Sequence, residues 1–244
     1  MNRRVLYKSP CPKCAICETP AACGWHQTNA AHTMGPENTF VARARSCRTH
    51  EDLQTLYAQW ANTYNTDLQS AAQNYVAPLI VAQTALKLGD QAKGAVLDAG
   101  CGTGLVGAAL AEGGAPSIDG LDLSPHMLRV AEKSGSYRNV FLGDLTKEIA
   151  KPSQSYDLVT CVGTFTHGHV GPIPALREFV RVLKDGGHIV ATVLEEIWVP
   201  GGFKAEVDQL QAEGLVEVVS TELKHYIKGQ DRAHVLVLRK MDTP

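Results

Sequence analysis

A glycine-rich segment after a short apolar run combines residue types that bind a nucleotide-like ligand. The run Val96–Ala99 reads as a buried strand, and the segment Gly100–Gly107 follows it directly. Glycines at such a turn let a ligand lie against bare backbone. Three glycines of this segment also satisfy the G-x-G-x-x-G pattern of dinucleotide-binding turns, with Asp122 placed 20 residues after the first of them, Gly102. The glycine pattern alone therefore leaves the ligand class open.

Asp98, at the end of the same strand, carries a negative charge that favours a cationic nucleoside over a dinucleotide as the ligand. A pyrophosphate held by the glycine turn would lie near this carboxylate, and two like charges about 4 Å apart in a partly buried site repel by several kcal/mol. A nucleoside that carries a sulfonium and an ammonium group would be attracted instead. The sequence thus favours S-adenosylmethionine, although a carboxylate that only caps the following loop is also compatible with this position.

The segment Asp98–Gly104 resembles motif I of the class I S-adenosylmethionine-dependent methyltransferases, and the later motifs of that family follow in order. The resemblance implies that Asp122 accepts hydrogen bonds from both ribose hydroxyls and that Met127 packs on the adenine. It places Asp144 at the adenine amino group and the end of the fourth strand beside the methionine moiety. The residues expected to bind this cofactor are Tyr64, Asp98, Gly100, Cys101, Gly102, Thr103, Gly104, Asp122, Leu123, Met127, Asp144, Leu145, Cys161 and Val162.

A second resemblance covers segments before and after this core. Tyr57, Trp60 and Tyr64, together with Thr166–Val170, are similar to segments of the methyltransferase-like proteins named for the Williams-Beuren syndrome chromosome region and of their fungal small-molecule relatives. The usual Tyr-Asp pair is Tyr64-Asn65 here, so the role of that acid is not carried over. The spacing puts the three rings on one helical face, and we expect Tyr64 to contact the cofactor sulfonium. Packing in the core is an equally good interpretation of Tyr57 and Trp60.

Two histidines follow the fourth strand, where the resembled family places residues that face the methyl acceptor. Imidazole titrates near pH 6.5, so His167 or His169 could take the proton of a hydroxyl acceptor as the methyl group is transferred. We expect at most one of them to face the pocket and favour His167, with Phe165 forming part of the wall. A purely structural role in the loop before Gly171 is equally compatible. No further ligands accompany the pair, so no metal is expected.

The rest of the sequence predicts the elements that position these residues. Short apolar runs alternate with helical patterns after Lys93, which predicts an α/β fold with a doubly wound, mostly parallel sheet covered by helices on both faces. Two further strands joined by Lys228–Asp231 predict a C-terminal antiparallel hairpin at the edge of a Rossmann-like, seven-stranded sheet. The expected strands are 95–99, 117–121, 140–142, 156–162, 188–194, 216–227 and 233–238, and the expected helices around them are 71–88, 105–112, 125–133, 173–183 and 203–213.

Three regions are expected along the chain. Residues 1–48 lack periodicity and are predicted to form a flexible, cysteine-rich tail, residues 49–92 a helical lid, and residues 93–244 the domain that binds S-adenosylmethionine. Cysteines 11, 14, 17 and 23 with His26 are zinc-ligand types, but all of them fall in one short stretch, whereas structural zinc sites use two separated pairs. A flexible extension is the preferred interpretation.

Composition excludes several classes of partner. The 244 residues carry a formal net charge of −2, so we expect no basic surface for nucleic acid. No segment approaches the roughly 20 consecutive apolar residues that span a bilayer, and the first residues lack the apolar centre of a signal peptide. The sequence therefore predicts a cytoplasmic protein with a small-molecule partner and leaves the oligomeric state undefined.

Three functions are compatible with these residues. The leading prediction is an S-adenosylmethionine-dependent methyltransferase that acts on a small phenolic or secondary-metabolite acceptor by in-line methyl transfer. A protein of the same fold that binds the cofactor without transferring the methyl group is an alternative, because fold alone does not determine chemistry. An NAD(P)-dependent oxidoreductase is a further alternative, which Asp98 and Asp144 oppose.

Overall fold

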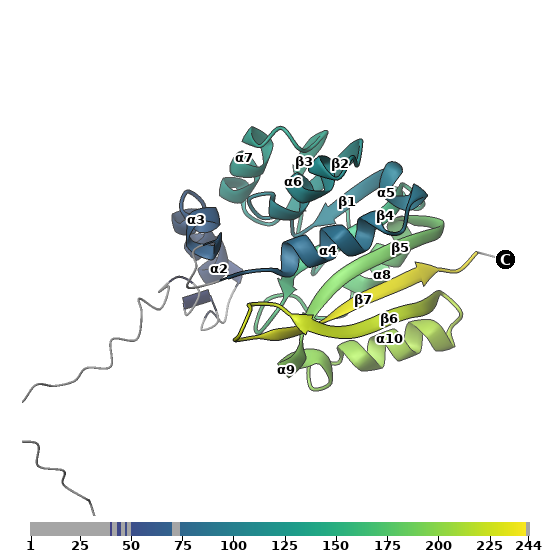
Figure 1. The fold of residues 1–244 in the computed structure, drawn as a ribbon. Coiled ribbons are helices and arrows are strands. Elements are labelled where there is room, and N and C mark those ends of the chain that lie inside the picture. Colours follow the sequence, from purple (N-terminus) through teal and green to yellow (C-terminus); the bar gives the residue numbers. More distant parts are fainter. Residues whose placement is uncertain (1–39, 41–42, 45–46, 48–49, 70–73, 243–244) are drawn as a thin grey trace, which may run out of the picture. The chain divides into compact units, whose positions relative to one another are not determined.

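The strands described by the computed structural model form one seven-stranded sheet in the order β3-β2-β1-β4-β5-β7-β6 (Figure 1). The model describes residues 40, 43–44, 47, 50–69 and 74–242, so the predicted cysteine cluster lies outside the described residues. Strands β3, β2, β1, β4 and β5 run parallel to one another, and β7 pairs antiparallel with both β5 and β6. This architecture confirms the predicted fold class. The strands are β1 (Ala95–Ala99), β2 (Ser117–Asp122), β3 (Asn139–Leu142), β4 (Tyr156–Phe165), β5 (Leu183–Leu194), β6 (Val216–His225) and β7 (Arg232–Lys240).

Strand order explains where a ligand can bind. The chain leaves β1 toward β2 and β3, returns to β4 on the other side of β1, and continues outward to β5. The connections that follow β1 and β4 therefore diverge, and they open a crevice at the carboxyl ends of the two strands. Both strands are almost fully buried in apolar surroundings, as expected for the centre of a parallel sheet.

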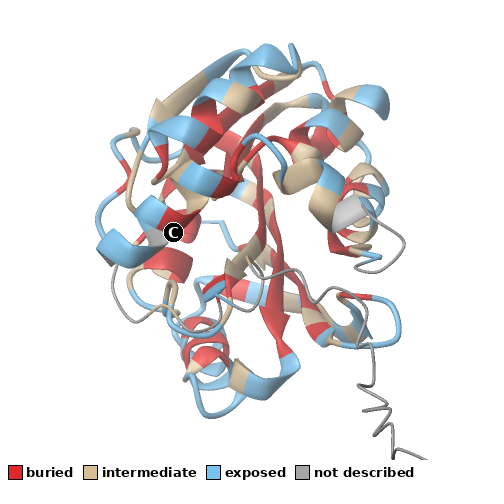
Figure 2. Cartoon of the chain, turned by 90° about the vertical axis from the view of Figure 1, so that its left-hand side faces the viewer, coloured by how far each residue is buried: buried red, intermediate tan, exposed pale blue. Residues whose placement is uncertain are grey.

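Helices cover both faces of the sheet, and the buried residues concentrate on the strands between them (Figure 2). On one face, α4 and α6 pack Val81, Ala85 and Leu110 against Val96 and neighbouring strand residues. On the other face, α8 and α10 pack against the second large apolar cluster. The helices that form these layers are α4 (Ala77–Leu86), α5 (Asp90–Lys93), α6 (Leu105–Glu112), α7 (Pro125–Lys133), α8 (Ala175–Val182), α9 (Glu195–Trp198) and α10 (Phe203–Ala212).

The N-terminal aromatic pattern folds as two helices, α2 (His50–Trp60) and α3 (Tyr64–Gln69), separated by a turn. The pattern itself predicted one continuous helix through Tyr64. The indole Nε1 of Trp60 donates a hydrogen bond to Asp67 Oδ2 at 2.8 Å, and Thr63 Oγ1 donates to the same oxygen at 3.0 Å. These bonds fix α3 against the end of α2, and α2 packs beside α7.

The structure differs from the predicted elements mainly at their ends. The next helix begins at Ala77 rather than near residue 71, and it packs on the sheet. Strand β5 begins at Leu183, five residues before the predicted start at His188. The C-terminal hairpin is confirmed, with β6 at the edge and β7 against β5. Within the described residues, none of the helices combines the length and the apolar character needed to cross a bilayer.

Candidate functional site

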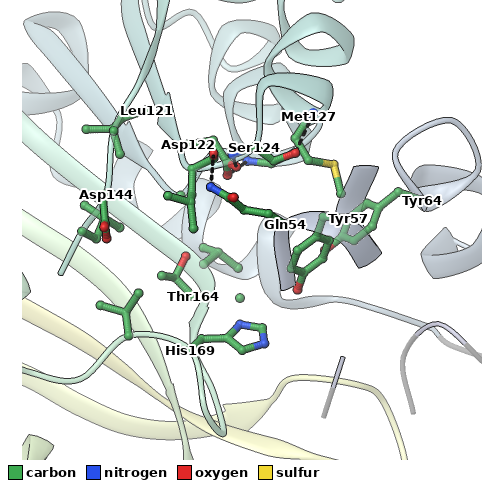
Figure 3. A pocket seen from close by; sticks show the side chains of 18 residues that line it. Gln54, Tyr57, Tyr64, Leu121, Asp122, Ser124, Met127, Asp144, Thr164 and His169 are labelled. Atoms are coloured by element: carbon green, nitrogen blue, oxygen red, sulfur yellow. Dashed lines mark hydrogen bonds between the residues drawn. The ribbon is translucent and has the colours of Figure 1, made fainter. Parts of the chain in front are cut away.

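A cleft of about 760 Å³ lies at the carboxyl ends of the parallel strands (Figure 3). Helices α2 and α3 contribute one wall, the start of α7 another, and the loop after β4 a third. The lining residues are Gln54, Tyr57, Tyr64, Gly100, Gly102, Leu121, Asp122, Leu123, Ser124, Met127, Gly143, Asp144, Leu145, Val162, Gly163, Thr164, His169 and Val170.

The structure brings most of the residues predicted to bind the cofactor into this one cleft, although they span about a hundred positions of the chain. Those that line it are Tyr64, Gly100, Gly102, Asp122, Leu123, Met127, Asp144, Leu145 and Val162. The predicted residues that do not line it are Asp98, Cys101, Thr103, Gly104 and Cys161. The strand ends and the glycine loop thus converge as the parallel topology requires.

The glycine loop presents bare backbone to the cleft. Gly102 has φ +54, and a Cβ on it would meet nothing within 4 Å, so the loop leaves open space at this point. Gly100 has φ +73, and its Cβ would lie 2.1 Å from Thr164 Oγ1. A side chain at residue 100 would therefore collide with Thr164 near the end of β4, whereas glycine lets both segments line the cleft.

Asp122 joins the glycine loop to the start of α7. Its Oδ2 accepts a hydrogen bond from the Gly102 amide at 2.8 Å, and its Oδ1 accepts one from the Ser124 amide at 2.8 Å. Burial raises the pKa of this carboxyl, while the backbone donors oppose the shift. Each carboxylate oxygen can accept more than one hydrogen bond, so a ligand hydroxyl can bind here without displacing either amide.

Asp98 lies behind the glycine loop rather than in the cleft. Tyr137 Oη donates a hydrogen bond to its Oδ2 at 2.7 Å, and Thr160 Oγ1 donates one to its Oδ1 at 3.0 Å. Side chains alternate along β1, so Leu97 and Ala99 enter the core on one face of the sheet while Asp98 points to the other. This carboxylate therefore does not line the cleft, and its two hydrogen bonds hold it behind the glycine loop.

The pH dependence of stability tests the buried state of Asp98. Burial raises its pKa to about 6, above the value of about 3.9 in an unfolded chain. The folded state therefore holds this proton over a pH range in which the unfolded chain has released it, and stability falls as pH rises through that range. We expect Asp98→Asn to remove this slope, a difference of about 3 kcal/mol in the free energy of unfolding accumulated between about pH 4 and 6.

Urea unfolding of the wild type and of Asp98→Asn at a series of pH values measures this difference directly. The exposed Asp90, whose side chain is 94% accessible, provides a matched control as Asp90→Asn. Parallel curves of unfolding free energy against pH for wild type and Asp98→Asn would show that the folded protein does not perturb this carboxyl.

The other predicted residues outside the cleft shape the loop around it. Cys101 packs with Leu128 in a small apolar cluster, and Cys161 is fully buried on the opposite side of the sheet from the neighbouring Val162. Gly104 has φ +96, and a Cβ there would lie 2.9 Å from the Tyr137 ring. The side chains of Cys101 and Cys161 are thus packed in apolar clusters and do not line the cleft.

Two positions that the sequence predictions did not include, Asn65 and Gln54, lie at the glycine loop and in the wall of the cleft. Thr103 Oγ1 donates a hydrogen bond to Asn65 Oδ1, which links α3 to the glycine loop. The departure of Asn65 from the family's usual acid pointed to this position. Gln54 lines the cleft, and its Nε2 donates to Leu123 O at 3.5 Å. Gln54 lies three positions before Tyr57, so both lie on one face of the same helix. This spacing could have indicated Gln54 from the sequence.

The aromatic residues of α2 and α3 divide between the cleft and a small core. Tyr57 and Tyr64 line the cleft, and burial raises the pKa of both phenols, which keeps them protonated. Trp60 is 2% exposed and stacks on Phe40 with ring centroids 5.5 Å apart. Trp60 thus packs in a small aromatic core with Phe40, while the rings of Tyr57 and Tyr64 form part of the cleft wall.

A second cavity of about 530 Å³ adjoins the cleft and shares Tyr57, Tyr64, Gly163 and His169 with it. Its remaining walls come from the segment before α4, the loop after β4 and the turn after β6. None of the described residues that line it is Asp, Glu, Lys or Arg. The lining residues are Ala44, Tyr57, Trp60, Tyr64, Tyr75, Gly163, Thr166, His167, His169, Leu194 and Tyr226.

The two histidines occupy different places. His169 lines both the cleft and the second cavity, and its ring makes an edge contact with Tyr57 at a centroid distance of 6.1 Å. His167 lines the second cavity but not the cleft, and its Nε2 lies 2.6 Å from Glu196 Oε2 on the exposed side. The geometry thus places His169, rather than the favoured His167, where the cleft and the second cavity meet.

The charges of the cleft fit a cationic nucleoside and oppose a pyrophosphate. In the described part of the chain, its only charged lining residues are Asp122 and Asp144, apart from the titratable His169. Asp144 Oδ1 accepts hydrogen bonds from Thr146 N and Thr146 Oγ1, which orients the carboxylate. A polyanion would meet two carboxylates and no Lys or Arg, whereas a sulfonium and an ammonium would be attracted. The open backbone at Gly102 gives such a ligand close access.

Comparisons with known proteins agree with this geometry. Residues 96–187 match the family model described as a methyltransferase domain. The human methyltransferase-like protein 27 is 32% identical over 185 residues, which cover 72% of this chain and 74% of the relative. The chain belongs to the class I S-adenosylmethionine-dependent methyltransferases. It is therefore a methyltransferase whose cofactor is S-adenosylmethionine.

Other similarities to this methyltransferase cover less of the sequence or show the fold alone. The ubiquinone biosynthesis O-methyltransferase of Xanthomonas oryzae pv. oryzae is 31% identical over 144 residues, and the chain spans 56% of that relative. A solved S-adenosyl-L-methionine-dependent methyltransferase of Methanococcus maripaludis superposes with a TM-score of 0.55 at 20% identity, covering 78% of this chain and 94% of that one. A TehB-like methyltransferase of Corynebacterium glutamicum gives 0.54 at 22% identity, covering 76% and 98%.

Proposed function

We propose that this methyltransferase transfers the methyl group to the hydroxyl of a small, uncharged phenolic acceptor bound in the second cavity. The observation that carries the proposal is the second cavity itself, which shares a wall with the cleft and is lined, among the described residues, mainly by aromatic rings and histidines and by no Asp, Glu, Lys or Arg. A planar aromatic acceptor would stack on these rings and bury its apolar surface.

The cofactor would occupy the cleft in the orientation that the motifs imply. Asp122 would hold the ribose hydroxyls, Met127 and Leu145 would pack on the adenine, and Asp144 would accept from its amino group. The methionine moiety would follow the glycine loop toward Tyr64, whose ring face stabilises a nearby cation. When bound, S-adenosylmethionine supplies an electrophilic methyl group on its sulfonium. Helices α2 and α3 would serve as the lid over it.

The lining of the second cavity favours a neutral acceptor over a charged one. Among the described residues, the second cavity offers no carboxylate to offset the repulsion between an ammonium acceptor and the neighbouring sulfonium. The same described residues offer no Lys or Arg to pair with a carboxylate or phosphate acceptor, and burying an unpaired charge is costly. The same lack of basic groups argues against a nucleic-acid acceptor. The name of the Xanthomonas relatives, O-methyltransferase, supports oxygen as the atom methylated.

In this proposal His169 takes the proton of the acceptor hydroxyl. A phenol has a pKa near 10, so loss of its proton makes the oxygen a much better nucleophile. The ring of His169 borders both the cleft and the second cavity, so an imidazole there can meet the hydroxyl beside the methyl group. The acceptor oxygen would then form the new O–C bond as the bond between the sulfonium sulfur and the methyl carbon breaks and S-adenosylhomocysteine leaves, and the proton would remain on His169 until solvent removes it.

Naphthalene derivatives that differ in one substituent test the acceptor class. We expect methyl transfer from radiolabelled S-adenosylmethionine to 2-naphthol, and no transfer to 2-naphthoate or to 2-naphthylmethylamine, because the ring is constant and only the charge changes. Turnover of the amine or of the carboxylate in preference to the phenol would contradict the proposal. Tight binding of S-adenosylhomocysteine without turnover of 2-naphthol or of other phenols would contradict a phenolic acceptor as well.

A further inference from the structure

One aromatic ring fills the space that three glycines leave beside the glycine loop. Tyr137 lies in the loop between α7 and β3. A Cβ on Gly104 would lie 2.9 Å from its Cε2, and a Cβ on Gly120 would lie 3.0 Å from its Cδ1. A Cβ on Gly107, in the first turn of α6, would overlap its Cζ and Oη. Two of the three glycines in the G-x-G-x-x-G pattern therefore make room for a side chain of the protein itself.

The hydroxyl of this ring holds the Asp98 carboxylate behind the glycine loop. It donates a hydrogen bond to Asp98 Oδ2 at 2.7 Å, while Thr160 Oγ1 donates to Oδ1 from β4 at 3.0 Å. The side chain of Asp98 is buried, so its charge depends on such donors. Because the ring of Tyr137 also borders Gly104, this one side chain joins the glycine loop to the carboxylate.

We propose that Tyr137 is a positioning residue of the cofactor site, which holds the glycine loop and the Asp98 carboxylate in the arrangement that binds S-adenosylmethionine. Its ring sets how closely α6 and β2 approach the loop, and its hydroxyl keeps a negative charge behind the backbone that borders the cleft at Gly102. Tyr137 does not line the cleft, so it acts through the loop and Asp98. The inference rests on the cofactor placement in the proposed function and not on the acceptor class.

The charges around Asp98 explain why its ionised form favours a cationic ligand. Burial raises the pKa of Asp98 to about 6, and the hydrogen bonds from Tyr137 and Thr160 oppose that rise. Helix α4, on the same face of the sheet, contributes no titratable group. The titratable groups that face Asp98 are Asp122 at the end of β2, Tyr137, Cys101 in the loop and Cys161 in β4.

Asp122 connects this buried charge to the cleft. Burial raises the pKa of the phenol and of both thiols, so Asp122 is the other member of this set that carries a negative charge. Its charge is close enough to raise the pKa of Asp98, and Asp122 itself lines the cleft. A cation bound beside Asp122 would therefore also be attracted by an ionised Asp98.

Tyr137→Phe tests the proposal, because it keeps the ring and removes only the hydroxyl. At pH 7 we expect it to weaken the binding of S-adenosylmethionine, measured by isothermal titration calorimetry, by about 3- to 30-fold, the range for residues that act on a site through a neighbour. Without this donor Asp98 takes up its proton at a higher pH, so the deficit relative to wild type should grow as pH falls from about 8 to about 6.5. In the Asp98→Asn background, where no charge is left to hold, Tyr137→Phe should change affinity by less than about twofold.

Tyr156→Phe is the matched control. Its hydroxyl also donates to a buried carboxylate, Asp119 Oδ2, at 3.0 Å, but Tyr156 begins β4 at the opposite end of the parallel strands from the glycine loop. This variant should bind S-adenosylmethionine within about twofold of wild type at every pH, because the carboxylate that it loses contact with is not joined to the loop. Urea unfolding checks that both Tyr→Phe variants are folded under the conditions of the titration.

Four results would overturn the inference while leaving the proposed function intact. They are wild-type affinity in Tyr137→Phe, an equal loss in Tyr156→Phe, a deficit that does not vary with pH, and an equal deficit in the Asp98→Asn background. The last two would show that the hydroxyl acts by packing and not through the charge of Asp98. A wild type that binds neither S-adenosylmethionine nor S-adenosylhomocysteine would contradict the proposed cofactor placement and the inference with it.

Discussion

Replacement of His169 by glutamine should lower kcat/KM for a phenolic acceptor by about 10²- to 10⁴-fold at neutral pH, the usual contribution of a general base. Glutamine approximates the size of the imidazole and its hydrogen bonding but cannot hold the proton. Because His169 borders the cleft only near the second cavity, we expect the affinity for S-adenosylhomocysteine to change by less than about threefold, or less than about 0.7 kcal/mol. Steady-state kinetics with 2-naphthol and calorimetric titration with S-adenosylhomocysteine measure the two quantities separately.

His167→Gln is the matched control for this prediction. Its imidazole lies in the same loop but points to Glu196 on the exposed side, so the substitution should reduce kcat/KM much less than His169→Gln. The reverse order of effects would restore His167 as the base that the sequence alone favoured. Equal, small effects in both variants would show that the acceptor oxygen reacts without a histidine base.

Replacement of Asp122 by alanine should weaken the binding of S-adenosylhomocysteine by about 1 to 3 kcal/mol, or roughly 5- to 150-fold. Two losses add at this residue. The ribose hydroxyls lose a charged acceptor, and the amides of Gly102 and Ser124 lose the carboxylate that holds the glycine loop against the start of α7. We therefore expect an effect toward the upper end of this range, measured by isothermal titration calorimetry.

Asp122→Asn separates the two losses. An asparagine oxygen can still accept from one amide and one hydroxyl, so this variant should bind S-adenosylhomocysteine more tightly than Asp122→Ala but less tightly than the wild type. Asp90→Ala, an exposed carboxylate in α5, controls for the change in net charge and should leave affinity unaltered. Unchanged affinity in Asp122→Ala would place the ribose elsewhere in the cleft.

Much of the fold could be predicted because its determinants are local. Helices α6 and α7 begin and end at the predicted residues, since a glycine loop precedes the first and Ser124-Pro125 starts the second. Strand β1 has its predicted bounds as well. Predictions were weaker where tertiary contacts set the boundaries, as at the break between α2 and α3, which Asp67 stabilises by accepting hydrogen bonds from Trp60 and Thr63.

Apolar periodicity and glycine spacing are properties of neighbouring residues, so the amino-acid sequence is enough to predict the parallel sheet, the position of the glycine loop and the acids at the strand ends. Which of these side chains line the cleft depends instead on how distant segments pack together. Asp98 is enclosed by Tyr137 and Thr160, which lie 39 and 62 positions later in the chain. The second cavity joins Tyr75, His169 and Tyr226, whose proximity depends on how three separate loops cross the ends of the strands. No local sequence pattern predicts that these three residues lie close together, because their proximity depends on the packing of the whole sheet.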